Sequence, residues 1–295
     1  MKSRHVVDLL VLGALWGASF LFMRQSAPEF GPIPLIALRV ALASLFLIPI
    51  LLVRRVRVDI RGRWRPLAIV GVMNSALPFC LFAFATLSVS AGFAAILNAT
   101  APLFGAIVAF FWLQERLSWE RIVGLCVGFL GIVILVSNRS TLSTGGNTLA
   151  VAAALGATFL YGAGANYAKR YLADVHPLAV ATGSQIAASL ALFLPALYAW
   201  PAETPGWNAW VNVLVLAVAC TGFAYILFFR LISNIGPSKA ITVTFLIPLF
   251  GMLWGVIFLH EEVTLNMMAS CGVIIAGTGL ATGFIRLPQK KATAH

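Results

Sequence analysis

The sequence predicts an all-α integral membrane protein with ten transmembrane helices, and three observations lead to this class. Hydrophobic residues make up 61% of the 295 residues and charged residues only 10%, whereas soluble domains average about 45–50% and 25%. The apolar residues gather in long runs, and a run of about 20 such residues can cross a bilayer. One motif also occurs twice. A chain this apolar cannot hide its side chains in one core, so its expected surroundings are lipid.

The apolar runs are separated by segments rich in proline, glycine, serine or arginine. They predict ten spans, at 6–23, 33–53, 66–87, 91–114, 119–137, 148–168, 177–199, 209–231, 237–259 and 264–285. With the N-terminus in the cytoplasm, 17 of the 20 Lys and Arg residues fall on the cytoplasmic side and two on the other. The positive-inside rule therefore predicts that both termini are cytoplasmic. The same distribution accounts for the net charge of +11 without a nucleic-acid partner.

The doubled motif defines an internal repeat. A-P-L-F-G at 101–105 precedes L-Q-E-R-L-S at 113–118, and I-P-L-F-G at 247–251 precedes L-H-E-E-V-T at 259–264, an offset of 146 residues. We expect one repeat in 1–140 and a second in 147–295. Because five helices is an odd number, the second copy must enter the membrane from the opposite side. An inverted repeat of two five-helix halves is typical of secondary transporters, which bind substrate where the halves meet.

These motifs, together with W-G-A-S-F at 16–20 and G-x-x-x-G-x-x-G at 124–131, resemble the drug/metabolite transporter superfamily in its ten-helix form of two EamA-type domains. The resemblance covers the full length and is strongest to the YddG-like amino-acid exporters of bacteria. It implies a basket in which helices 1, 3, 4, 6, 8 and 9 surround a central cavity, while helices 5 and 10 pack toward the rear.

Polar and aromatic residues inside the spans are the candidates for substrate contact. A polar side chain in a span more often joins two helices than touches a ligand, but here several converge on the expected cavity helices. A zwitterion leaving water needs hydrogen-bond partners, and paired aromatic rings can form apolar walls. The predicted substrate-binding residues are Trp16, Asn74, Phe79, Phe82, Asn98, Tyr161, Tyr225 and Thr244.

Three prolines inside spans predict bends beside the substrate path. Pro102 and Pro248 occupy equivalent places in the two copies, and Pro78 interrupts the third span. A proline inside a helix removes a backbone hydrogen bond and frees a carbonyl. A packing kink is an equally good explanation for any one of them, but the symmetric pair favours a gating role.

Charged residues inside the spans are few. Arg39 is expected either to extend toward the interface or to pair with Glu29, and Glu115 and Glu261 close the two motif helices. No acidic residue falls near the middle of a span, where a proton-coupled carrier usually has one. Facilitated diffusion is therefore the expected mechanism, and proton-coupled export of drugs or other metabolites is the alternative.

Other function classes find no support in the sequence. The four histidines lie in loops or at helix ends, and neither H-E-x-x-H nor G-x-S-x-G occurs, which disfavours an intramembrane enzyme. A channel would need a filter or a charged ring. The four cysteines have no metal-binding spacing. The sequence thus predicts a multi-pass exporter of the cell inner membrane that carries amino acids, works as a monomer and needs no cofactor or metal.

Overall fold

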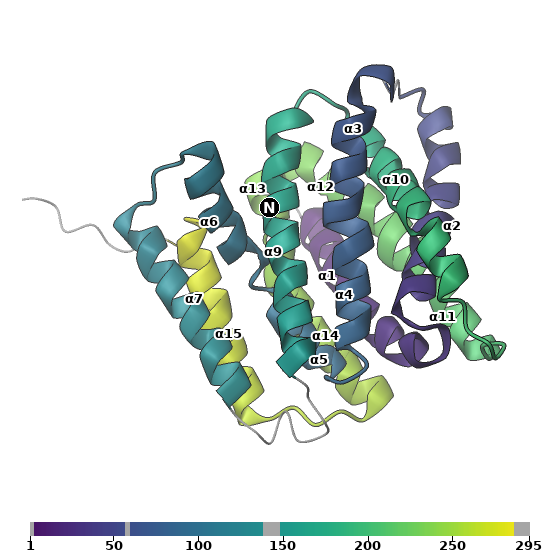
Figure 1. The fold of residues 1–295 in the computed structure, drawn as a ribbon. Helices are drawn as coiled ribbons and strands as arrows, with labels where there is room; N and C mark the ends of the chain where they lie inside the picture. The colour runs from purple at the N-terminus through teal and green to yellow at the C-terminus, as the bar shows by residue number, and fades with distance from the viewer. Residues whose placement is uncertain (1–2, 57–59, 138–147, 286–295) are drawn as a thin grey trace, which may run out of the picture.

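The computed structural model describes residues 3–56, 60–137 and 148–285, and every regular element in these ranges is a helix (Figure 1). Eight helices are long and apolar enough to cross a membrane: Ser3–Phe30, Pro32–Val53, Gly62–Ala85, Ala91–Leu113, Trp119–Ser137, Thr148–Tyr171, Pro177–Tyr198 and Trp207–Ile235. Two shorter apolar helices follow, Val243–Leu259 and Leu265–Ala281. The predicted class, an all-helical multi-pass membrane protein, is confirmed.

Four of the expected spans contain an interruption. The elements of the first half are α1 (Ser3–Phe30), α2 (Pro32–Val53), α3 (Ile60–Gly71), the π-helix η1 (Val72–Ala76), α4 (Leu77–Ala85), α5 (Ala91–Asn98), α6 (Ala101–Leu113) and α7 (Trp119–Ser137). Those of the second half are α9 (Thr148–Tyr171), α10 (Pro177–Tyr198), α11 (Trp207–Ala217), the π-helix η2 (Val218–Phe223), α12 (Ala224–Ile235), α13 (Pro237–Ala240), α14 (Val243–Leu259) and α15 (Leu265–Ala281).

The interruptions change the position expected for one of the three prolines. Pro102 was expected in mid-helix, but it lies in the first turn of α6, directly after a break at 99–100. A proline there removes no helical hydrogen bond, because the first turn has no intrahelical acceptor for that N–H. Pro78 lies inside the continuous helix Gly62–Ala85, two residues after η1, so the third span is interrupted beside it as expected. Pro248 lies inside α14, as expected, where it is buried.

Local geometry recurs at the offset of the sequence repeat. The π-helix η1 begins at Val72 and η2 at Val218, and α6 ends at Leu113 as α14 ends at Leu259. The residue after each of these two helices is left-handed, with φ of 57° at Gln114 and 52° at His260. Left-handed non-glycine residues are uncommon, so their recurrence 146 residues apart adds to the evidence of the motifs.

The glycines of the doubled motifs lie at two close helix crossings. A Cβ on Gly17 of α1 would lie 2.9 Å from the backbone nitrogen of Gly251 in α14. A Cβ on Gly162 of α9 would lie 2.5 Å from the backbone nitrogen of Gly105 in α6. Glycine permits this approach of two backbones, which is how helices commonly pack in lipid. The crossings join the first half to the second.

The helices α7 and α15 lie side by side along one edge of the molecule (Figure 1). The pair agrees with the expectation that helices 5 and 10 pack away from the centre. Glycines again allow the contact, since a Cβ on Gly124 of α7 would lie 2.8 Å from the carbonyl oxygen of Gly277 in α15. Both chain ends, whose cytoplasmic position the sequence predicts, fall outside the described residues.

Candidate substrate site

A buried arginine lies where the two halves of the chain meet. Arg39 of α2 is 3% exposed. Its Nε donates a 2.9 Å hydrogen bond to the hydroxyl of Thr221 in η2, and one terminal nitrogen lies 3.7 Å from the sulfur of Met23. Arg39 joins none of the four ion pairs among the described residues. A buried ion without a counter-ion costs several kcal/mol, so this arginine needs an explanation.

The sequence-based expectation for Arg39 was wrong. The side chain does not extend to the interface, and its expected partner Glu29 instead accepts a 2.6 Å hydrogen bond from the backbone nitrogen of Gly206. The position of Arg39 in the sequence could have indicated its role, because it is the single charged residue between Pro32 and Val53. An ionisable residue in the middle of a span indicates function by default.

One predicted residue, Phe79, covers the guanidinium, and two more predicted residues extend this aromatic cluster. The Arg39 Cζ lies 3.7 Å above the ring centroid of Phe79 in α4. Tyr161 of α9 stacks on Phe82 at 6.0 Å and meets Phe79 edge-on at 6.3 Å, measured between ring centroids. A desolvated cation–π contact stabilises by about 2 kcal/mol, which offsets part of the burial cost of Arg39.

A second polar contact mirrors the first. The amide nitrogen of Gln185 in α10 donates a 2.8 Å hydrogen bond to the hydroxyl of Ser75 in η1, and both residues are fully buried. Gln185 follows Arg39 by 146 residues, and Thr221 follows Ser75 by the same number. In each half, therefore, a side chain of the second helix reaches the π-helix of the opposite half. One of the two contacts carries a positive charge and the other is neutral.

Buried polar atoms without partners mark the same region. The Oε1 atom of Gln185 and the Oδ1 atom of Asn74 are buried and accept no hydrogen bond from another described residue. Asn74 belongs to η1 and packs directly against Gly164 of α9, where any side chain would collide with it. A π-helical turn often occurs at a functional site, and two unsatisfied acceptors at η1 indicate a place for a ligand there.

The other predicted residues make different contacts. Trp16 packs on Phe228 with ring centroids 5.2 Å apart, and Tyr225 stacks on Phe229 at 6.0 Å. Asn98 ends α5, and its side chain makes no hydrogen bond to another described residue. The hydroxyl of Thr244 donates a 2.8 Å hydrogen bond to the backbone carbonyl of Ile241, three residues earlier. Substrate contact by all eight residues remains a prediction.

An apolar groove approaches the cluster from one side. Its volume is about 550 Å³, and it runs between α1, α11 and α14. Trp254 lines it and donates a 3.0 Å hydrogen bond from its ring nitrogen to the Ala14 carbonyl. Cys220 of η2 also lines it, next in sequence to Thr221. The groove therefore reaches the π-helix that holds the Arg39 partner.

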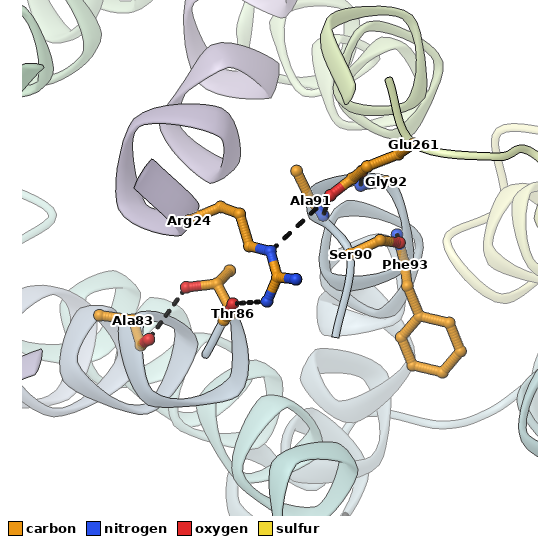
Figure 2. A network of polar contacts seen from close by, with 8 residues as sticks. All are labelled: Arg24, Ala83, Thr86, Ser90, Ala91, Gly92, Phe93 and Glu261. Atoms are coloured by element: carbon orange, nitrogen blue, oxygen red, sulfur yellow. Dashed lines mark hydrogen bonds and ion pairs between the residues drawn. The ribbon is translucent and has the colours of Figure 1, made fainter. Parts of the chain in front are cut away.

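A polar network joins α1, the start of α5 and the residues just beyond α14 (Figure 2). The Glu261 carboxylate, just beyond α14, accepts hydrogen bonds from the backbone nitrogens of Ala91 at 2.9 Å and Gly92 at 3.4 Å. It thereby caps the N-terminus of α5, where a negative charge is favourable. Arg24 of α1 lies 3.9 Å from the same carboxylate and donates to the backbone carbonyl of Thr86. We call Arg24, Glu261 and the start of α5 the Glu261 clasp.

An ion pair in the other half is the counterpart of this clasp. Lys169 of α9 lies 2.6 Å from the carboxylate of Glu115, just beyond α6. Glu115 precedes Glu261 by 146 residues and Arg24 precedes Lys169 by 145. The hydrogen bond from Lys169 lowers the pKa of Glu115. The Glu115 side chain is 37% exposed against 14% for Glu261, and among the described residues it accepts no hydrogen bond from a helix N-terminus.

Comparison with known protein families also divides the chain into two similar halves. A model of the EamA-like transporter family matches the chain twice, over residues 6–137 and 148–283. The chain belongs to the EamA-like transporter family. It is therefore a multi-pass membrane transporter, as the motifs and the apolar helices predict, and relatives named as transporters speak against an enzyme.

Relatives span nearly the whole transporter. An uncharacterized transporter of Archaeoglobus fulgidus is 25% identical over 94% of this chain and 97% of its own length. The threonine/homoserine exporter RhtA of Salmonella typhimurium is 29% identical over 90% and 86%. A crystal structure at 19% sequence identity covers 97% of this chain and 99% of its own, with a TM-score of 0.67. That structure supports the fold alone.

Proposed function

We propose that this transporter exports small metabolites, including amino acids with aromatic or bulky neutral side chains, from the cytoplasm across the cell inner membrane. The observation that carries the proposal is the cluster of Arg39, Phe79, Tyr161 and Thr221, which joins a cation, aromatic walls and a hydroxyl where the two halves meet. The relative RhtA is named as an exporter of two amino acids, which supports the substrate class.

The mechanism that we propose is alternating access by an inverted repeat, with domains at 1–140 and 147–295. Paired π-helices, left-handed helix ends and glycine crossings at offsets of 145 or 146 residues support this arrangement. The Glu261 clasp and the Glu115–Lys169 pair would then lie at opposite ends of the carrier and close in alternation. Every residue of the cluster comes from one chain, which supports a monomer.

We propose that transport proceeds by facilitated diffusion and is not coupled to protons. In the described residues, the acidic groups lie toward helix ends, and Asp8 of α1 is paired with Arg230 of α12. None of them contacts the Arg39 cluster. The alternative, a proton-coupled exporter of drugs or other metabolites, draws support from the apolar groove of about 550 Å³ beside the cluster.

An uptake panel in proteoliposomes tests the proposal. Purified transporter is reconstituted, and initial uptake of labelled phenylalanine, leucine, threonine and a cationic dye is measured with and without an imposed pH gradient. We expect saturable amino-acid uptake that the pH gradient does not drive above equilibrium. Accumulation that depends on the gradient would favour the alternative mechanism, and dye uptake without amino-acid uptake would favour the alternative substrates.

A further inference from the structure

We propose that Arg39 binds the carboxylate of the transported molecule, so that small organic monocarboxylates are the substrate class and Arg39 is its principal specificity determinant. This inference rests on the proposed export function and names the chemical group that the site selects. Three observations carry it: an unbalanced buried charge, a neutral counterpart in the other half, and the aromatic surroundings of the guanidinium.

The charge of Arg39 lacks an anion. The guanidinium is always protonated and has five N–H donors, yet the described residues offer it one hydroxyl, one thioether sulfur and one ring face. The second terminal nitrogen has no hydrogen-bond partner among the described side chains. A carboxylate accepts two parallel hydrogen bonds from a guanidinium. Such a ligand would supply the missing negative charge.

The fold itself does not require a charge at this position. Gln185 makes the equivalent contact in the other half, from the second helix of its repeat to the π-helix of the opposite repeat. A neutral amide therefore suffices to tie these elements together. The positive charge is the feature that distinguishes Arg39 from its counterpart, and a role in ligand binding accounts for it.

The surroundings favour a monocarboxylate over a phosphate. A phosphate dianion would call for a second basic group, and no other described Lys or Arg contacts Arg39, Phe79 or Thr221. Phe79 covers the guanidinium, and Tyr161 meets the Phe79 ring edge-on. These rings can contact the apolar part of an organic acid while its carboxylate binds Arg39.

Ligand-induced thermal stabilisation of the purified transporter tests the inference directly. The probes are 3-phenylpropionate and 3-phenylpropionamide, which share a ring and a chain but differ in charge. We expect the acid to raise the melting temperature and the amide to have little effect, with sodium chloride at equal concentration as the salt control. Equal responses of the wild type to acid and amide, or no response to the acid, would overturn the proposal without any variant.

Variants at position 39 then locate the effect. Arg39→Gln installs the residue that the chain uses at the equivalent position, and we expect the half-saturating acid concentration to rise at least about tenfold, the effect of losing one charge-assisted hydrogen bond. We expect Arg39→Lys to weaken binding less. The matched control is Arg54→Gln, which removes an exposed positive charge just beyond the same helix and should bind the acid like the wild type.

The unliganded melting temperature separates binding from structure. Because Arg39→Gln removes an unpaired buried charge, we expect it to melt no lower than the wild type. A variant that melts much lower yet still discriminates the acid from the amide would show a structural arginine and overturn the inference. Phenylalanine exchange in liposomes separates the two proposals. Exchange that survives in Arg39→Gln would refute the carboxylate site but leave amino-acid export standing. Wild-type protein that binds the acid but exchanges no amino acid would refute amino-acid export but leave the carboxylate site standing.

Discussion

Arg39 and the rings around it are the residues on which the account depends. A cation held 3.7 Å above the centroid of Phe79 and bonded to Thr221 is positioned by both halves of the chain. Movement of one half against the other must therefore change its surroundings. This coupling gives a carrier a simple way to bind a ligand in one state and release it in another.

Truncation of the aromatic residues should separate binding from selectivity. Tyr161→Ala removes the ring that contacts both Phe79 and Phe82, and we expect export of every substrate to fall by about tenfold, near the upper end for aromatic contacts. Phe79→Ala should instead change the ranking of bulky and small substrates. The measurement is initial efflux per amount of reconstituted protein. Phe111→Ala, on an exposed ring, is the control, and unchanged rates in both site variants would place the substrate elsewhere.

The Glu261 clasp gives a second prediction at this scale. Glu261→Gln removes the charge that interacts with Arg24 and with the N-terminus of α5, worth about 1 kcal/mol in partly exposed sites. We expect the exchange rate to change severalfold, because one closed end becomes less stable. The neighbouring Glu262→Gln alters an exposed carboxylate and should leave the rate unaltered. Identical rates for both variants and the wild type would argue against a gate here.

Helix crossings decide how the two halves fit together. At α1–α14 and α6–α9 the backbones approach so closely that only glycine fits on one side. The motif glycines of the two copies meet at these crossings, which explains in packing terms why P-L-F-G recurs and why Gly17 and Gly162 occupy equivalent positions.

Substitution at these crossings should destabilise the fold. We expect Gly17→Val and Gly162→Val each to lower the melting temperature in detergent by several degrees, because the new Cβ would meet backbone atoms within 3 Å. The control is Gly272→Ala in α15, where nothing lies within 4 Å of an added Cβ and helix propensity improves. A melting temperature in either valine variant as high as in the control would show that the crossings are not tight in solution.

Sequence reasoning reached the helices, but not Arg39 or most of the interruptions. Apolar runs of about 20 residues are sufficient to recognise spans, whereas the roles of Phe79, Phe82 and Tyr161 stay predictions although their rings meet in the structure. Pro78 follows η1 and marks the interruption of its span, but η2 has no proline inside it and no comparable signal in the sequence. Long side chains like that of Arg39 can extend either way from a helix, and only the packed structure settles which.

At the level of the whole molecule, polar contacts gather at two ends of the bundle. Arg63 pairs with Asp174 and Lys169 with Glu115 among segments expected in the cytoplasm, whereas Glu29 binds Gly206 and Arg24 meets Glu261 among those expected outside. Each contact joins segments that the basic-residue count assigns to the same side. The grouping agrees with the predicted orientation.

Cysteine labelling in intact cells tests this orientation directly. We expect a membrane-impermeant maleimide to label Glu203→Cys without permeabilisation and to label Asp174→Cys only after the membrane is opened. The reason is the positive-inside rule, which places 17 basic residues on the cytoplasmic side. The parent protein with its four native cysteines gives the background signal. Labelling of position 174 in sealed cells would reverse the orientation.

Counterflow in proteoliposomes tests the central claim, alternating access to one site, most directly. Vesicles loaded with unlabelled phenylalanine are diluted into a trace of labelled phenylalanine, without any ion gradient. The account predicts transient accumulation of label above equilibrium in wild-type vesicles and the loss of this accumulation in Arg39→Gln. Label entry that never exceeds equilibrium, rises linearly with concentration and is the same in both proteins would contradict it.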